Sequence, residues 1–302
     1  MTDAEGRKRI SDVKINYKIN NSGWWSIRTY SGEWSIWADE GDRVTIWAQK
    51  NNFSFQPSPY DIEVTGDRSD LIFELSRWQD DFSDPGSGWD LKNENAGYYE
   101  GEYWLEVIPP GYTSIKTLAP YAAPTSYSIE ADMEASGDGC YGFVFNITDH
   151  SDYYHIFRVC PQGNKENGYV PFWELCKAII EGYTPQGVML KLEREAWGQD
   201  ASRIRIKKEH NRLKVEQNWR EIRLYIGSGS EPVWVDEIDT EVTDAIKYGL
   251  YASINSGNPY VAYFDDFIFT AIGFKKVKLQ TSQFSTLSIP TQNLITSKDI
   301  EL

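Results

Sequence analysis

The chain contains 302 residues, with 45 acidic and 30 basic side chains and a formal net charge of -15. This length allows one large domain or two unequal domains, and the acidic excess excludes general affinity for nucleic acid or anionic membranes. Aromatic residues make up 15% of the chain, including 12 tryptophans, which is typical of β-sandwiches and of proteins that stack on sugar rings.

The first predicted elements follow a polar segment, residues 1–9, which we interpret as a leader or a cloning remnant without a secretory signal. Residues 10–76 hold short alternating apolar stretches separated by Gly, Pro, Asn and Asp clusters, a pattern that predicts a small β-sandwich. Within it, the stretch from Gly41 to Leu75, with Gly-Asp-Arg-Val-Thr-Ile-Trp-Ala and Ile-Glu-Val-Thr-Gly, resembles small prealbumin-like or immunoglobulin-like sandwiches of bacterial surface proteins. That resemblance implies a spacer.

This small domain is rich in indole rings, for which two interpretations stay open. A domain of this size packs large rings to bury enough apolar area, and an exposed aromatic patch would instead dock on the second domain or on another subunit. The residues concerned are Trp24, Trp25, Trp34, Trp37 and Trp47.

Residues 77–272 form the second predicted domain. Strands of 5 to 8 residues bounded by turn residues predict an antiparallel sandwich, with a helical turn expected only in Lys177–Gly182 and Asp239–Lys247. The order of motifs, from Asp-Asp-Phe-Ser-Asp-Pro at 80–85 to Phe-Asp-Asp-Phe at 264–267, is similar to the concanavalin A-like, laminin G-like jelly rolls. The predicted fold class is all-β: a small β-sandwich followed by an antiparallel jelly roll. Residues 273–302 are an appended strand or an interaction tail.

The strand around Ile129 carries the sharpest catalytic candidate. Alternation places Glu130, Asp132 and Glu134 on one face, and Glu-x-Asp-x-Glu resembles the catalytic strand of family 16 glycoside hydrolases. That resemblance implies a nucleophile at Glu130, an acid/base at Glu134 and a tuning residue at Asp132. The alternative is the polar face of a half-exposed strand.

Two Asp-Asp-Phe motifs are the candidate metal site. The first and last strands of jelly rolls are usually neighbours, so the four acids are expected to converge on a calcium ion, which binds 6 to 8 oxygens. Their alternative role is to cap turns. They are Asp80, Asp81, Asp265 and Asp266.

The candidate ligand site is aromatic. Alternation puts Tyr154, Ile156 and Arg158 on one face of a strand, where a ring and a charged group are available to a sugar. We expect Trp173, Trp104 and Tyr98 to add further rings to this site. For each ring alone, ordinary packing is the alternative.

Cys140 and Cys160 are placed symmetrically about a predicted hairpin near His150. They face each other if the register holds, and a disulfide there implies an oxidising compartment. Two free buried thiols are the alternative, and Cys176 is unpaired in either case.

These observations favour a non-catalytic module that binds a glycan or a protein at a bacterial cell surface. Calcium is the one candidate cofactor, and a homo-oligomer through the small domain or the tail is a further expectation. A glycoside hydrolase and a structural subunit of a surface assembly are the alternative functions, and a cytoplasmic protein is the alternative location.

Overall fold

The structure is a computed structural model that describes residues 10–68, 71–89, 95–109, 113–148, 152–163, 168–184, 187–199, 202–205, 209–238, 246–255, 257–272, 293–297 and 300–301. Every regular element in these ranges is a strand, which confirms the all-β prediction. The chain divides into two compact units, Met1–Trp78 with Ala271–Leu302, and Gln79–Thr270. The C-terminal segment therefore belongs with the N-terminal residues.

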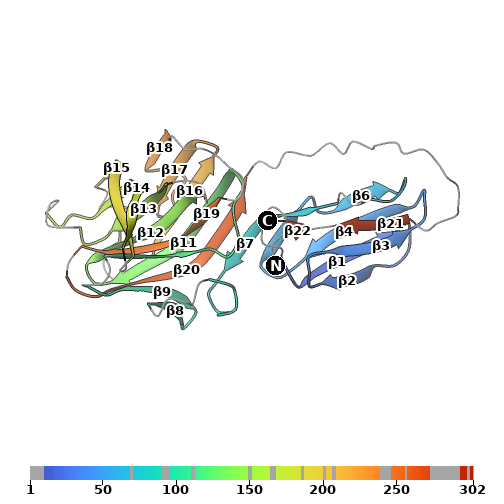
Figure 1. The fold of residues 1–302 in the computed structure, drawn as a ribbon, viewed down its shortest axis with the longest axis horizontal. Helices are drawn as coiled ribbons and strands as arrows, with labels where there is room; N and C mark the ends of the chain where they lie inside the picture. Colours follow the sequence, from blue (N-terminus) through green and yellow to red (C-terminus); the bar gives the residue numbers. More distant parts are fainter. Residues whose placement is uncertain are drawn as a thin grey trace. The chain divides into compact units, whose positions relative to one another are not determined.

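The first unit contains a four-stranded antiparallel sheet in the order β2-β1-β4-β6. Its strands are β1 (Val13–Ile19), β2 (Trp25–Thr29), β4 (Arg43–Gln49) and β6 (Tyr60–Glu63). A separate strand, β3 (Trp34–Ala38), pairs antiparallel with β21 (Asn293–Ser297) near the end of the chain (Figure 1). β5 (Phe53–Gln56) pairs with β7 (Phe73–Asp80), and β22 (Ile300–Glu301), near the end of the sequence, runs parallel to β7. Of the two interpretations of residues 273–302, the appended strand is the one formed at β21.

The tryptophans of this unit divide between core and surface. Trp34 is buried and its ring lies 6.0 Å from that of Phe73, whereas Trp24, Trp25 and Trp37 are more than half exposed. The exposed rings cannot be explained by a need to fill a small core. Core packing thus accounts for Trp34, and docking by the exposed rings stays a prediction.

The second unit is a sandwich of two antiparallel sheets (Figure 1). The first sheet has the order β10-β19-β12-β13-β14-β15, with β10 (Ser114–Leu118), β19 (Lys247–Ile254), β12 (Gly139–Ile147), β13 (Tyr153–Cys160), β14 (Phe172–Thr184) and β15 (Gly187–Gly198). The second has the order β18-β17-β16-β11-β20, with β18 (Trp234–Glu237), β17 (Glu221–Ile226), β16 (Asn211–Asn218), β11 (Ser126–Ser136) and β20 (Tyr260–Ala271). β9 (Glu102–Val107) pairs with β20, and β8 (Ala96–Tyr99) pairs with β9.

Aromatic rings fill the space between these two sheets. The ring of Phe143 lies 6.4 Å from that of Phe267, and the rings of Tyr248 and Phe269 are stacked 5.4 Å apart. All four are fully buried, and each such side chain contributes about 1.5–3 kcal/mol through the hydrophobic effect. The aromatic richness of the sequence is thus largely used in the core.

The prediction of a helical turn at Lys177–Gly182 is wrong, because these residues lie inside β14 between β13 and β15. Pairing on both sides satisfies the backbone of this segment and overrides its local preference. The second predicted turn falls mostly on residues 239–245, outside the described residues, and Lys247 begins β19. In the described part of the chain there is no helix that could cross a membrane.

Candidate functional site

The six-stranded sheet has an inner face in the sandwich core and an outer face that points away from the second sheet. On β13, Phe157 lies opposite Phe143, whose ring meets Phe267 of the second sheet, so Phe157 is on the inner face. Side chains alternate along a strand, and Tyr154 and Arg158 therefore share the outer face, as the sequence pattern predicts.

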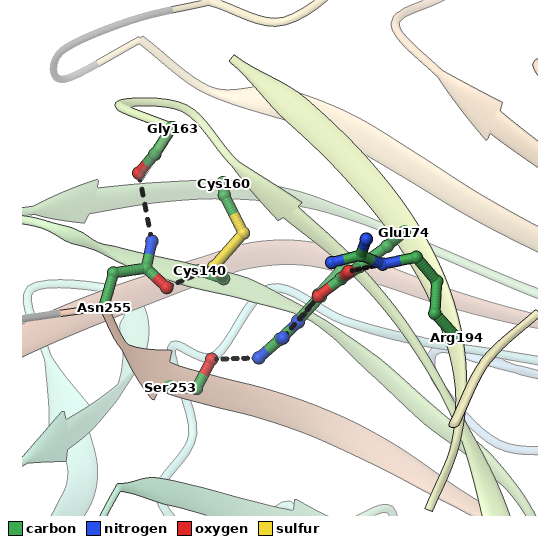
Figure 2. The surroundings of a disulfide bond; sticks show 8 residues. Cys140, Cys160, Gly163, Glu174, Arg194, Ser253 and Asn255 are labelled. Atoms are coloured by element: carbon green, nitrogen blue, oxygen red, sulfur yellow. Dashed lines mark hydrogen bonds and ion pairs between the residues drawn. A yellow bond between two sulfur atoms is a disulfide. The ribbon is translucent and has the colours of Figure 1, made fainter. Parts of the chain in front are cut away.

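A charged network occupies this outer face. Arg158 and Glu174 are directly opposite on β13 and β14, and the Arg158 Nε donates to Glu174 Oε1 over 2.6 Å. A second bond to the same oxygen comes from Nη2 of Arg158, and its Nη1 donates to Ser253 Oγ over 2.9 Å. Arg194 on β15 donates from Nε to Glu174 Oε2 over 2.8 Å (Figure 2). Both carboxylate oxygens are thus occupied by guanidinium groups.

Glu174 is so deeply buried that its carboxylate needs the guanidinium partners. Glu174 is 1% exposed, and a buried carboxylate without a partner would lose several kcal/mol of hydration. Burial disfavours the charged form of Arg158, but Tyr251 and Glu174 outweigh it and raise the pKa of the guanidinium above its usual value. The Arg158 guanidinium remains ionised, and its bonds to Glu174 and Ser253 fix it in place.

A disulfide lies at one end of the network. Cys140 on β12 and Cys160 on β13 are bonded, and Oδ1 of Asn255 lies 3.4 Å from Sγ of Cys140 (Figure 2). The Nδ2 of Asn255 donates to the Gly163 carbonyl over 3.1 Å. Of the two open alternatives for this cysteine pair, the structure contains the disulfide, and Cys176 is free and buried.

At its other end the network borders an apolar cluster on the same face. Tyr154 and Tyr251 are nearly fully buried there, packed with Val144, Ile156 and Ala178. The ammonium of Lys116 on β10 lies 3.7 Å from the centre of the Tyr154 ring, a cation–π distance. Part of the Lys116 side chain is accessible to solvent. The surrounding protein nevertheless displaces water from its ammonium, and this desolvation lowers the pKa to about 8.

An exposed indole lies beside the network on β15. Trp197 is directly opposite Glu174, and 52% of its surface is accessible. The guanidinium carbon of Arg194 lies 5.8 Å from the Trp197 ring centre. The outer face therefore combines a flat apolar ring, a fixed carboxylate and a half-exposed guanidinium.

Sequence reasoning missed Arg194 and Trp197 as site residues. They are three positions apart, so strict alternation would place them on opposite faces. The register between β14 and β15 shifts between Leu175 and Cys176, and this irregularity brings both side chains to the outer face. The half-exposed run of polar and apolar residues in β15 gives no sign of such a shift.

The remaining predicted ligand residues do not lie on the outer face. Trp173 is 5% exposed on the inner face, where its Nε1 would be 2.7 Å from a Cβ at position 198, so that only glycine fits there. Trp104 is half-buried and alternates with the fully buried Tyr103 on β9. Tyr98 is half-buried, with its ring 5.0 Å from that of Tyr103 and its hydroxyl 2.8 Å from Ser87 Oγ. The structure therefore brings together Tyr154 and Arg158 but not the other three.

The carboxylates predicted as catalytic share one face of β11, as alternation requires. Arg212 on β16 forms ion pairs with Asp132 over 3.2 Å and with Glu130 over 3.6 Å, and His210 lies 3.7 Å from Glu134. The intervening residues of β11 are in the core. This face belongs to the second sheet and points away from the outer face of the first.

Three of the four acids predicted to bind calcium accept hydrogen bonds within the protein. Asp80 is buried and accepts hydrogen bonds from the Phe82 amide and from Trp89 Nε1 over 2.9 Å each, while Asp81 accepts from Ser83. Asp265 accepts from the amide of Asp266. Among the described residues, no group of three or more His, Cys, Asp and Glu side chains is placed to hold a metal ion. Calcium binding stays a prediction, and in the structure Asp80 and Asp81 cap the turn that follows β7, whereas Asp265 and Asp266 lie within β20.

No family model and no curated protein matches the sequence. Solved structures do show similarity. A carbohydrate-binding module, CBM66 from Bacillus subtilis, is 12% identical with a TM-score of 0.43, over 61% of this chain and 96% of that one. The β-glucanase of Bacillus licheniformis is 14% identical with a TM-score of 0.40, over 65% and 98%. A chain from work on endo-acting O-glycanases of the human gut microbiota is 11% identical with a TM-score of 0.44, over 65% and 99%. Identities this low bear on the fold alone.

Proposed function

We propose that the protein is a non-catalytic carbohydrate-binding module that holds a glycan on the outer face of its six-stranded sheet. The observation that supports this most directly is Trp197, half exposed beside a carboxylate that two arginines hold in place. A sugar ring stacks on an indole through its apolar face while its hydroxyls bind fixed donors and acceptors. Trp197 supplies the stacking surface and the half-exposed Arg194 supplies hydrogen-bond donors, while the buried Glu174 holds the Arg194 guanidinium in place.

The state of Glu174 supports binding over hydrolysis. A glycosidase needs one carboxylic acid that can donate a proton and a second carboxylate about 5–9.5 Å from it. Both oxygens of Glu174 already accept bonds from guanidinium groups, so neither oxygen is placed to pass a proton to a ligand. Hydrolysis by Glu130 and Glu134 is the competing function, and it is motivated by their common face on β11.

The disulfide supports a location outside the reducing cytoplasm. Disulfides persist in secreted and cell-surface proteins and are rare where glutathione and thioredoxin keep thiols reduced. Cys140 and Cys160 form such a bond beside the proposed ligand site. The proposal therefore places the module at a cell surface or in the extracellular medium.

A glycan array probed with the full chain, with calcium and with EDTA, tests the proposal. Glycans that bind are then measured by calorimetry with Trp197→Ala and with Trp219→Ala, a matched control because Trp219 is 58% exposed on the hairpin between β16 and β17. We expect at least a tenfold loss of affinity in Trp197→Ala and none in Trp219→Ala, since tenfold is about 1.4 kcal/mol and a large apolar side chain contributes about 1.5–3 kcal/mol when it is covered.

The same glycans are incubated with the wild-type protein and assayed for new reducing ends. Glycan turnover that disappears in Glu134→Gln would establish the hydrolase instead. Equal affinities in the two tryptophan variants would remove the outer face as the ligand site. A loss of binding in EDTA would establish the calcium prediction.

A further inference from the structure

The outer face of the six-stranded sheet carries an excess of positive charge in an acidic protein. β10, β19, β12 and β13 are consecutive neighbours in this sheet, and none of the 45 acidic residues of the chain lies in them. Lys116 and Arg158 lie at outward positions of these strands, and Arg194 on β15 adds a third cation. Among the described residues, Glu174 is the one carboxylate that pairs with any of the three.

The charged groups and the exposed indole belong to one row across the sheet. Six residues, one from each strand, lie directly opposite one another in the order Lys116, Tyr251, Gly142, Arg158, Glu174 and Trp197. Directly opposite residues project from the same face of a sheet. Because neighbouring strands are about 4.8 Å apart, the two ends of this row are about 24 Å apart along the sheet. A ligand that extends from the indole toward the lysine is therefore an oligosaccharide.

The ammonium of Lys116 has an aromatic partner and no charged one. It lies 3.7 Å from the centre of the Tyr154 ring, and among the described residues no carboxylate lies within ion-pair distance of it. Since β19 and β12 separate β10 from β13, the two side chains meet above these strands, where the outward Gly249 and Gly142 carry no side chains. The lysine is exposed, so a ligand can reach its ammonium.

The surroundings of Lys116 favour an anion beside its ammonium. Desolvation alone lowers the pKa to about 8, because no carboxylate among the described residues offsets the lost hydration. Most of the side chain is still protonated at pH 7. An anionic group of a ligand would supply the missing counter-charge and raise the pKa again.

We propose that the glycan on the outer face is an acidic oligosaccharide, which places an anionic group on Lys116 while another of its sugar residues stacks on Trp197. This inference rests on the function proposed above and names the class of its ligand. A carboxylate and a sulfate ester both supply the anionic group, because a lysine ammonium acts as a point charge with three donors.

Calorimetry with the full chain at pH 7 tests the proposal with two pairs of probes. Tetragalacturonate is compared with its methyl ester, and a κ-carrageenan tetrasaccharide with its desulfated form, so that each pair differs in charge on the same sugar chain. Sodium sulfate is the inorganic comparison. We expect at least one acidic tetrasaccharide to bind, and to bind at least tenfold more tightly than its uncharged form.

Substitution of the lysine then tests its part in binding. Lys116→Met is expected to weaken the acidic ligand at least tenfold, because the counter-charge is lost. Lys214→Met is the matched control and should have no effect. The Lys214 ammonium also lies over a tyrosine ring, that of Tyr225, but on β16 in the second sheet.

Proton uptake gives a readout that a purely structural role of Lys116 would not produce. About half of a lysine with a pKa of about 8 is neutral at pH 8, so anion binding there should take up as much as about half a proton per chain. Binding enthalpies in buffers of different ionisation enthalpy measure this uptake. Lys116→Arg, which stays charged, should keep the affinity and lose the uptake. The other titratable or charged side chains of this face are Tyr154, Arg158, Glu174, Cys176, Arg194, Lys247 and Tyr251, and burial raises the pKa values of Tyr154 and Cys176 away from pH 8.

Several results would overturn the acidic ligand. These are equal affinity for the charged and uncharged forms, no binding of either acidic tetrasaccharide, equal affinity for sodium sulfate, and unchanged affinity in Lys116→Met. If uncharged glycans still bind and lose affinity in Trp197→Ala, the function proposed for the outer face stands and only this inference fails. Binding that is lost in Lys116→Met but unchanged in Trp197→Ala would instead overturn the stacking on Trp197, and with it the proposed function.

Discussion

Arg158 and Glu174 face each other across β13 and β14, and the guanidinium donates twice to one carboxylate oxygen while a third nitrogen reaches Ser253 on β19. One arginine thus links three strands of the outer face. Glu174 is buried, and its charge and that of Arg158 neutralise each other. The pair therefore fixes the polar groups of the outer face, and removal of either residue leaves the other without this partner.

Removal of one member of this pair is expected to destabilise the jelly-roll unit. Arg158→Met leaves Glu174 buried with Arg194 alone, and we expect a loss of about 3 kcal/mol in the free energy of unfolding. Arg194→Met, which removes a half-exposed partner, is expected to lose less than about 1 kcal/mol. Urea denaturation followed by tryptophan fluorescence measures both, and equal losses would contradict the obligatory role of Arg158. The double variant Arg158→Met with Glu174→Met should recover most of the stability, because no buried charge is left unpaired and Arg194, which loses Glu174, is half exposed.

The three cysteines give a direct count of thiols. Burial raises the pKa of Cys176 to about 12, so we expect no reaction with a thiol reagent at pH 8 in the native protein. In guanidinium chloride without reductant we expect one reactive thiol per chain, since Cys140 and Cys160 are bonded. Three thiols under those conditions would show that the disulfide does not form.

The same disulfide is expected to contribute to stability. It joins residues 20 apart in sequence, a loop for which closure contributes about 3 kcal/mol. Replacement of both cysteines by serine should lower the free energy of unfolding by about this amount. A change close to zero would indicate that the β12–β13 hairpin is already closed in the unfolded chain.

Lys116 is expected to react unusually fast with acylating reagents. With a folded pKa of about 8, about half of its amine is neutral at pH 8, compared with under about 1% for an ordinary lysine. Mass spectrometry after brief labelling with an N-hydroxysuccinimide ester should find Lys116 modified before Lys177, whose ammonium also lies over a tyrosine ring.

The pH dependence of stability gives a second test of the lowered Lys116 pKa. Since the unfolded chain binds more protons than the folded one between about pH 8 and pH 10.5, the Lys116 contribution to stability rises with pH across that window. Lys116→Met should therefore raise Tm more at pH 7 than at pH 10. A pH-independent difference would contradict the lowered pKa.

Asp265 is expected to be mildly destabilising when ionised. Burial raises its pKa, and the charges of Asp266 and Asp132 add to this effect, partly offset by the Asp266 amide and His210. The penalty is present above the folded pKa and is relieved as the pH falls toward the unfolded value. Asp265→Asn keeps the acceptor for the Asp266 amide and should raise Tm by about 1–2 °C at pH 7. Thermal unfolding at pH 7 and pH 3.5 checks this, and a gain that persists at pH 3.5 would exclude an electrostatic cause.

Most of the correct predictions came from the alternation of side chains along strands, which repeats every two residues. The alternation in Tyr153–Val159 placed Arg158 correctly, and the alternation around Ile129 placed the three acids of β11 on one face. Both follow from strand geometry alone. The symmetric positions of Cys140 and Cys160 about a hairpin left the disulfide open, because the register depends on pairing that a single strand does not reveal.

The errors lie where tertiary pairing decides the outcome. The register shift beside Leu175 put Trp197 on the outer face, and pairing on both sides made Lys177–Gly182 a strand. The second unit comprises residues 79–270. That the last residues pair with β3 could not be predicted, since contact between segments about 255 residues apart leaves no local signal.

The pairing of β3 with β21 also determines when the first unit can be completed during synthesis. Asn293–Ser297 is synthesised about 255 residues after Trp34–Ala38. At about 5–20 residues per second, the synthesis of the intervening residues takes roughly 13–51 s. The unit between β3 and β21 therefore has time to fold before these two strands can pair.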